Sequence, residues 1–272
     1  MNLLVETHHR VRRIVLNRPE KRNALTGEMC DGLARAIESA QSDPNVGCIF
    51  ITAVGQVFSA GMDLDEALSA SGPELGAIHE KLFTIGAESE KPIVVAVNGA
   101  ALGGGLGLVA QGHVVIAEES SKFGLPEIHI GLWPFLVYRA IEAAIGERRT
   151  LELSLTGRVF SAHNALAWGM VSQVCRDDEV CDRAAAVARD LAKASPAAIA
   201  AGMRYAREAR GKSWSEAGEL GRDLRETLMQ SDDFRQGCAA FKAKREPEWP
   251  SMPGEFYAAR RKHENHVQTG KS

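Results

Sequence analysis

Three consecutive glycines and a carboxylate in a proline-fixed turn lie in the stretch of residues 91–134, and both residue types can do chemistry. Residues 91–97 form an apolar run rich in β-branched side chains, which predicts a buried strand. Gly103, Gly104 and Gly105 follow and lead into an apolar helical pattern at 106–111. The unpaired N–H groups of a first helical turn suit a phosphate or a carbonyl oxygen that gains negative charge. The glycines also allow the helix to pack closely on the sheet, and both interpretations can hold together.

The carboxylate is Glu127, which lies in a turn beside Pro126. A second apolar run, residues 113–117, precedes this turn and predicts another strand. The order is therefore strand, glycine turn, helix start, strand and carboxylate. This order brings backbone N–H groups and one acid near each other.

A second turn with small residues follows an earlier strand. Residues 46–52 predict a strand, and the loop 53–65 that follows contains Ala60 and Gly61. Two exposed backbone turns, each following a strand, are what a two-donor oxyanion hole requires.

A dinucleotide site is a weaker interpretation of the same glycines. Residues 105–110 (GLGLVA) fit the pattern G-x-G-x-x-A and follow a strand. However, five residues separate the strand from the glycines, where that fingerprint needs a tight turn. Glu127 has the spacing of the ribose-binding acid, but it follows Pro126 in a turn and does not end a strand.

The remaining patterns predict an α/β core followed by helices. A hairpin is expected from residues 3–5 and 11–16, then a helix capped by Thr26 that runs to about residue 42, and a helix at 72–88. Further helices are expected at 138–145, 147–155, 162–168, 179–194, 196–210 and 213–244, with one strand at 171–174. We divide the chain into a core, residues 1–195, and a helical region, residues 196–272, whose end at 260–266 is polar.

Composition indicates a globular protein of a reducing compartment. The 272 residues carry a net charge of −3, with 45% hydrophobic and 25% charged residues, which gives no electrostatic case for nucleic acid or an acidic membrane surface. The five cysteines are scattered along the chain, and no two of them form a C-x-x-C motif. This favours reduced thiols over disulfides or a zinc site. No apolar run reaches the length of a membrane helix, and the N-terminus lacks the features of a signal peptide. We expect a cytoplasmic protein.

Five motifs in order resemble those of the enoyl-CoA hydratase/isomerase family, the crotonase superfamily. Residues 58–64 (FSAGMDL) resemble its F-x-A-G-x-D-L/I loop, and residues 98–105 (NGAALGGG) resemble its N-G-x-A-x-G-G-G turn. The other three are residues 123–128 (FGLPEI), 155–158 (LTGR) and 239–247 (AAFKAKREP). The likeness runs from about residue 11 to residue 249, and five motifs in the right order make it specific. It favours a catalytic Glu127 over the surface carboxylate that position alone suggests.

The resemblance implies a fold, an assembly and a substrate. The fold is a spiral of repeated ββα units, followed by helices that build a homotrimer, often paired into a hexamer. The substrate is an acyl-CoA thioester, with coenzyme A as part of the substrate and no separate cofactor or metal. The implied catalytic residues are Glu127 and the oxyanion donors Met62 and Gly104. The implied substrate-binding residues are Arg22, Ala24, Ser59, Ala60, Gly61, Asp63, Leu64, Gly103, Trp133, Phe241 and Lys244.

The sequence departs from the hydratase pattern at Gly107. Members that hydrate 2-enoyl-CoA carry one glutamate at this position and a second in the P-E motif, and here only Glu127 is present. A single carboxylate can move one proton from the carbon α to the thioester to the γ carbon, which favours double-bond isomerisation over hydration. We expect the apolar residues 133–135 to raise the pKa of Glu127. A different acid, Glu118, Glu119 or His129, could replace the missing one; in an extended segment His129 would point to the same side as Glu127.

Other functions remain open on the sequence alone. A hydratase is the nearest alternative, and an acyl-CoA hydrolase or dehalogenase is more distant because one fold hosts several chemistries. A non-catalytic acyl-CoA-binding or RNA-binding relative is a different class, but the basic residues 10–22 lack the interleaved aromatic residues that RNA binding needs. Residues 263–266 (HENH) do not form the H-E-x-x-H metal motif.

Overall fold

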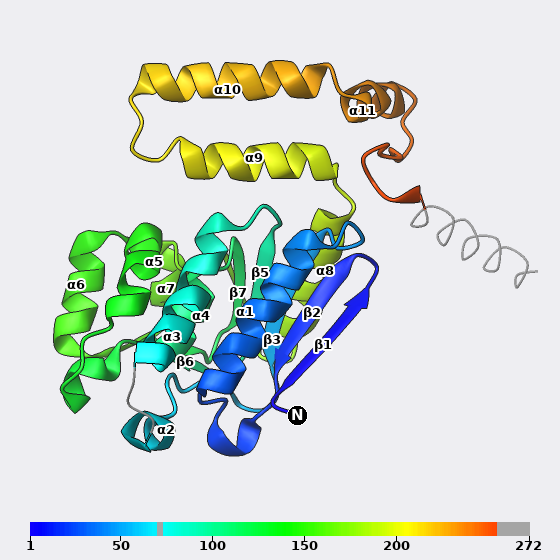
Figure 1. The fold of residues 1–272 in the computed structure, drawn as a ribbon. Coiled ribbons are helices and arrows are strands. Elements are labelled where there is room, and N and C mark those ends of the chain that lie inside the picture. The colour runs from blue at the N-terminus through cyan, green and yellow to red at the C-terminus, as the bar shows by residue number, and fades with distance from the viewer. Residues whose placement is uncertain (70–72, 255–272) are drawn as a thin grey trace, which may run out of the picture.

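The computed structural model describes residues 1–69 and 73–254, and its centre is a six-stranded sheet (Figure 1). The strand order is β1 (Leu3–His8), β2 (Val11–Leu16), β3 (Cys48–Ala53), β5 (Ile93–Val97), β7 (Val114–Glu118) and β10 (Gln173–Cys175). β1 pairs with β2 antiparallel, and the other neighbours are parallel. Every residue of β5 is buried, as expected for a parallel strand covered on both faces.

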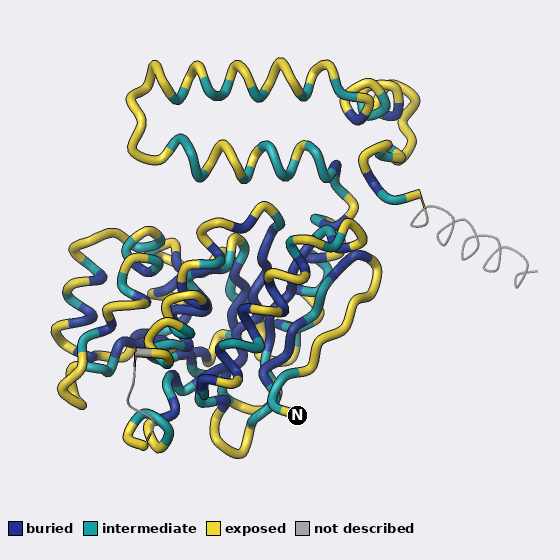
Figure 2. The backbone as a smooth tube through the Cα atoms, in the orientation of Figure 1, coloured by how far each residue is buried: buried dark blue, intermediate teal, exposed yellow. Residues whose placement is uncertain are grey.

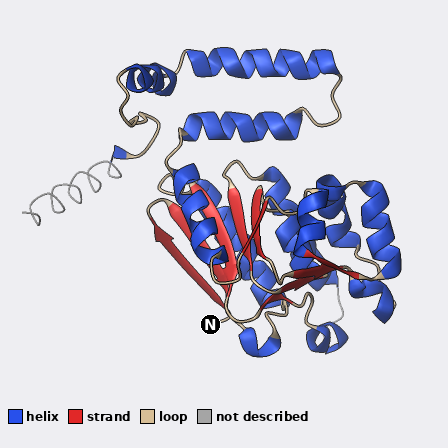
Figure 3. Ribbon diagram, turned by 180° about the vertical axis from the view of Figure 1, so that it is seen from behind, coloured by secondary structure: helices blue, strands red, loops and turns tan. Residues whose placement is uncertain are grey.

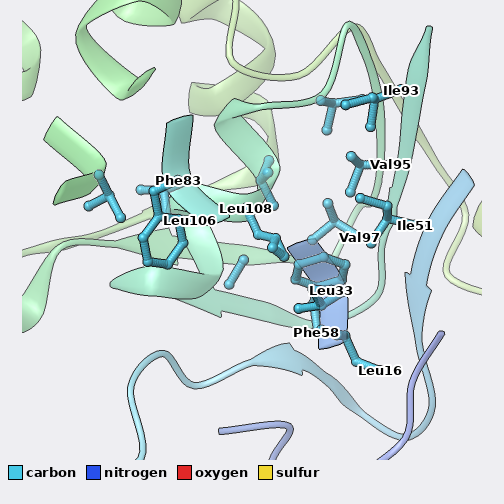
Figure 4. Packing of buried hydrophobic residues seen from close by; sticks show 14 of the residues in the cluster. Leu16, Leu33, Ile51, Phe58, Phe83, Ile93, Val95, Val97, Leu106 and Leu108 are labelled. Carbon is cyan, nitrogen blue, oxygen red and sulfur yellow. The ribbon is translucent and has the colours of Figure 1, made fainter. Parts of the chain in front are cut away.

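Alternate residues of the central strands face two different hydrophobic clusters. Ile51 and Val95 contribute to the larger cluster together with helix α1 (Gly27–Ser42), and Figure 4 shows part of this packing. Phe50 and Val94 face the other side, where helix α8 (Val180–Ala192) covers the sheet with a stripe of small residues. The sheet therefore lies between helices on both faces.

A second sheet of four short strands positions the loops of interest, and Figure 3 shows both sheets from behind. Its order is β4 (Val57–Ser59), β6 (Ala100–Leu102), β8 (Lys122–Gly124) and β9 (Val159–Ser161). β3, β5 and β7 are each followed by one strand of this second sheet and then by a helical segment. β4, β6 and β8 are parallel neighbours, so the loops that leave their carboxyl ends meet at one edge.

The helical segments between and after the strands are mostly short. They are η1 (Pro19–Lys21), α2 (Leu64–Ser69), α3 (Pro73–Ile85), η2 (Gly86–Glu88), α4 (Gly104–Ala110), η3 (Pro126–Ile130), α5 (Phe135–Ile145), α6 (Glu147–Thr156) and α7 (Ala162–Trp168). None of the helices in the described part of the chain is both long and apolar enough to cross a membrane.

Helices α9 (Pro196–Glu208), α10 (Trp214–Met229) and α11 (Asp232–Lys242) form an arm that stands off the core (Figure 1). Neither α9 nor α10 contains a buried residue, and Figure 2 shows both largely exposed or half-buried. The arm lies within the predicted helical region 196–272, and the exact division of that region from the core stays a prediction.

The α/β class and most helices agree with the sequence analysis, but several details differ. The pattern at 213–244 is not one helix, because Ser231 caps a new helix by accepting a hydrogen bond from the Phe234 N–H. Residues 100–102, expected within a turn, form β6, and β4, β8 and β9 were also not predicted; three residues are too few to show a period. Gly72 and the polar end at 260–266 lie outside the described residues.

Candidate active site

A cavity of about 440 Å³ opens where the loops after β4, β6 and β8 meet. Its lining is mostly apolar, as is usual for a small-molecule site. The first loop contributes residues 60–62, the second residues 103 and 104, and the third residues 126–127 and 129–130, while residues 132–137 close one wall. The remaining lining residues are Leu25, Cys30, Leu64, His79 and Phe83.

The N–H of Met62 is free for a ligand because of a one-residue β-bridge. Leu25 and Met62 form this parallel bridge, in which the Leu25 N–H donates to Gly61 O (2.7 Å) and the Asp63 N–H donates to Leu25 O (2.9 Å). Alternate peptide groups of an extended segment point to opposite sides, so the Met62 N–H points away from Leu25. Met62 lines the cavity, and no acceptor within residues 1–69 and 73–254 takes up its N–H.

The N–H of Gly104 is free because it opens helix α4. The first hydrogen bond of that helix runs from the Gly107 N–H to Gly103 O, 3.0 Å away, which leaves the preceding N–H groups without intrahelical acceptors. A Cβ built on Gly61 would lie 3.4 Å from Gly104 N, so the two loops are in close contact. The two unpaired N–H groups therefore line one cavity, as two donors to a single oxygen must.

Glu127 brings a carboxylate to the same place. It lies in η3, and its Oε1 would be 2.9 Å from a Cβ built on Gly103, whose φ of +52° favours glycine. The Oε2 atom is buried and has no hydrogen-bond partner among the described residues. Burial raises the pKa of Glu127, in the predicted direction, although a backbone hydrogen bond partly offsets the rise. A carboxyl group with these features suits proton transfer.

The space beside Gly107 is already filled. A Cβ built there would lie 2.2 Å from Val137 Cγ1 and 3.2 Å from Phe83 Cδ1, and both of these side chains are buried. A longer side chain at this position would therefore need the wall of the cavity to move. The packing around position 107 therefore fits a glycine and not a glutamate.

We expect the substitution Gly107→Ala to destabilise the fold by about 1–3 kcal/mol, because it overpacks a buried contact. Combining Gly107→Ala with Val137→Ala should recover part of the lost stability, because it removes the opposing methyl groups. Unfolding in urea measures both effects. The control is Gly202→Ala in α9, where a Cβ meets nothing within 4 Å and alanine favours the helix. Parental stability of Gly107→Ala would contradict the packing described here.

The three residues that could replace the missing glutamate, Glu118, Glu119 and His129, lie in different places. The Glu118 carboxylate accepts a hydrogen bond from the Gly99 N–H (2.9 Å), and neither Glu118 nor Glu119 lines the cavity. His129 lines the cavity, but the expectation that it shares a side with Glu127 in an extended segment is wrong, because both lie in the helical turn η3. Its Nε2 lies against Gly157, 2.4 Å from where a Cβ would stand.

The residues predicted to bind substrate fall into three groups. Ala60, Gly61, Leu64, Gly103 and Trp133 line the cavity. Arg22, Ala24, Ser59 and Asp63 do not line it. Phe241 belongs to α11 and Lys244 follows that helix, and neither of them lines the cavity.

The second group mainly supports the loop that carries Met62. The Asp63 carboxylate pairs with Arg18 (2.5 Å) and accepts a hydrogen bond from the Glu66 N–H, and this pairing lowers its pKa. The Ser59 hydroxyl donates to Asn23 O and accepts from the Gly61 N–H. Both side chains are buried, so their hydrogen bonds fix the loop from behind.

The apolar residues 133–135 line the cavity as expected, but the sequence analysis did not identify the walls supplied by α1, α3 and the rest of α5. His79 and Phe83 lie one helical turn apart on α3 and both line the cavity, as does Val137 at the start of α5. The i, i+4 spacing of His79 and Phe83 was a usable signal, since it places them on one face. Within the described ranges there is no group of three or more His, Cys, Asp or Glu side chains that could hold a metal ion.

Comparisons of the sequence and of the structure with known proteins point to the same family. The sequence model of the enoyl-CoA hydratase/isomerase family matches residues 6–252. A probable enoyl-CoA hydratase of Mycobacterium leprae is 35% identical over 255 residues, which cover 91% of this chain and 97% of the relative. A 1,2-epoxyphenylacetyl-CoA isomerase of Escherichia coli is 33% identical over 248 residues, which cover 87% and 93%. The crystal structure of human enoyl-CoA hydratase domain-containing protein 3 matches with a TM-score of 0.87 and 28% identity over 92% of this chain and 100% of that one.

These matches agree with the five motifs and with the repeated ββα units, and they confirm the predicted fold. The described segments that carry the motifs all lie within the matched range. The chain is therefore an enzyme of the enoyl-CoA hydratase/isomerase family, the crotonase superfamily.

Proposed function

We propose that this enzyme shifts the double bond of an enoyl-CoA thioester from carbon 3 to carbon 2. The thioester oxygen accepts hydrogen bonds from the N–H groups of Met62 and Gly104. Glu127 removes a proton from carbon 2, and the negative charge spreads to the oxygen held by the two donors. The same carboxyl group then returns the proton to carbon 4. One proton leaves and one arrives, so no water or cofactor is consumed.

The observation that carries this proposal is the solitary, unpaired carboxylate. Glu127 is the only carboxylate among the described residues that line the cavity, and its Oε2 has no partner in that part of the chain. Hydration of a double bond in this family's scheme uses two carboxylates to orient and deprotonate one water. The position of the second one is occupied by Gly107, against which Val137 packs. One acid with a raised pKa suits a proton relay between two carbons.

The direct test is to supply a 3-enoyl-CoA and a 2-enoyl-CoA separately and to identify the products by mass spectrometry and NMR. The proposal expects the two substrates to interconvert without gain of water. A 3-hydroxyacyl-CoA product with no double-bond shift would make the enzyme a hydratase, which is the named activity of several relatives.

The pH dependence should reflect the raised pKa of Glu127. As a base, Glu127 acts only when ionised, so kcat/KM should rise with pH to a midpoint above the usual glutamate range. Stability should change in the opposite direction. In this pH window the native protein binds more protons than the unfolded chain, so the free energy of unfolding falls as pH rises.

Steady-state kinetics and urea unfolding across this pH range measure the two effects. The free energy of unfolding of the Glu127→Gln protein should not fall over this pH range, because glutamine has no proton to release. An activity midpoint within or below the usual glutamate range would contradict the role given to Glu127.

We further propose that the coenzyme A moiety runs along the outside of the Met62 loop. Ala24, Ala60 and Gly61 are small enough to border it, and the exposed Arg22 is free to face a phosphate. Phe241 and Lys244 would reach the nucleotide end only from a neighbouring copy. A homotrimer or a dimer of trimers would provide that copy, and the exposed side chains of Trp214 (96%) and Phe241 (86%) on the arm support such an assembly. The five free cysteines support a reducing, cytoplasmic location.

A further inference from the structure

His79 of α3 lines the cavity one helical turn before Phe83. Phe83 lies against the oxyanion loop, since its Cζ would be 3.2 Å from a Cβ built on Gly104. The rings of His79 and Phe83 have centroids 6.3 Å apart, and both residues line the cavity. An acyl chain that extends from the thioester past Phe83 therefore reaches His79, which lies one turn closer to the start of α3. This places His79 beside the tail of the acyl group and not beside its reacting carbons.

The imidazole of His79 has no hydrogen-bond partner within the described part of the chain, although it is half-buried in a mostly apolar wall. Its ring nitrogens are therefore available to a ligand in the cavity, whose hydrogen bonds would replace those that the ring makes to water. Burial lowers the pKa of His79 more than the nearby charge of Glu66 raises it, so the ring is neutral near pH 7. A neutral imidazole offers one donor and one acceptor.

The surroundings of His79 narrow the chemistry of its ligand. Glu66 is held in place, because its Oε2 accepts a hydrogen bond from the Gly27 N–H (2.7 Å). Its negative charge acts on both His79 and Cys30, which also lines the cavity. Burial raises the pKa of the Cys30 thiol to about 12, so Cys30 stays uncharged. This end of the cavity therefore suits a neutral polar group and disfavours a carboxylate.

We propose that His79 is a specificity-determining residue that binds a hydroxyl or carbonyl group on the tail of the acyl chain. The preferred substrate is then an acyl-CoA whose tail is oxygenated and uncharged. This inference rests on the proposed function, because it takes the acyl chain to extend from the oxyanion donors through the same cavity.

The test compares the binding of unreactive ligands by isothermal titration calorimetry. The probes are octanoyl-CoA and hydroxyoctanoyl-CoA isomers that carry the hydroxyl on successive carbons towards the chain end. The parent should bind at least one isomer about five- to tenfold more tightly than octanoyl-CoA, as expected for one hydrogen bond. His79→Leu should abolish this preference and bind octanoyl-CoA at least as well as the parent. His79→Gln, which keeps a donor and an acceptor, should retain part of the preference.

The control is His163→Leu on the exposed surface of α7, which should leave all affinities unchanged. The inference on His79 is overturned if the parent binds octanoyl-CoA but prefers no hydroxylated isomer, or if His79→Leu keeps the preference. Failure to bind any of these thioesters, octanoyl-CoA included, would instead overturn the proposed function and the inference with it.

Discussion

The substitution Glu127→Gln should lower kcat for the double-bond shift by about a hundred- to ten-thousandfold, the usual contribution of a general acid or base. Glutamine fits the same space beside Gly103 but cannot take up a proton at neutral pH. Binding of the thioester should change little, because the donors Met62 and Gly104 are untouched. Steady-state kinetics with a 3-enoyl-CoA and calorimetric titration with a saturated acyl-CoA separate the two effects.

The matched control for this substitution is Glu118→Gln. Burial also raises the pKa of Glu118, but its carboxylate accepts a hydrogen bond from the Gly99 N–H outside the cavity. Glutamine keeps an oxygen that can accept this bond, so kcat should stay close to that of the parent. Equal activity of the Glu127→Gln protein and the parent would refute the proton-transfer role of Glu127.

The substitution Gly61→Ala should lower kcat by about a hundred- to thousandfold, as loss of one oxyanion donor does. The Cβ would lie 2.8 Å from Leu102 O and 3.4 Å from Gly104 N, so the loops that carry the two N–H groups must move apart. Leu102 belongs to β6 and cannot easily give way. Kinetics with a 3-enoyl-CoA measure the loss, and circular dichroism shows whether the fold is kept.

Backbone strain at Gly61 must be separated from this collision. Gly61 has a φ of +91°, a conformation that alanine rarely adopts. Gly211→Ala is the matched control: Gly211 has a φ of +77°, but a Cβ there meets nothing within 4 Å. The control should lose some stability and keep its kcat. A Gly61→Ala enzyme with parental kcat would show that the spacing of the two loops does not matter.

Patterns within short stretches of the sequence predicted the main strands and helices of the core. The run at 91–97 contains β5, because a continuous β-branched stretch suits a strand buried on both faces. Thr26 caps α1 as expected, through a hydrogen bond from the Met29 N–H, and the helix buries one face against the sheet. The short strands β4, β6, β8 and β9 could not be predicted in the same way. Each has three residues, and pairing with neighbours distant in sequence creates it.

For the site, the sequence predicted which turns would meet and the apolar wall at 133–135, but not the other residues that surround them. Gly103 and Gly104 of the glycine turn, the loop at 60–62 and Glu127 line one cavity, because each follows a strand of the same short sheet. The contact between Gly107 and Val137 was not predictable, since it depends on how α5 packs against α4. Arg18 was also missed, because its pairing with Asp63 joins residues from separate loops.

The transfer of a labelled proton tests the central claim most directly. A 3-enoyl-CoA with deuterium on carbon 2 is converted in ordinary water, and the product is analysed by NMR at early conversion. If Glu127 alone carries the proton within a cavity poor in polar groups, part of the deuterium lost from carbon 2 should appear on carbon 4. A shifted double bond with no deuterium on carbon 4 from the earliest time, or a product that has gained water, would contradict the single-carboxylate relay.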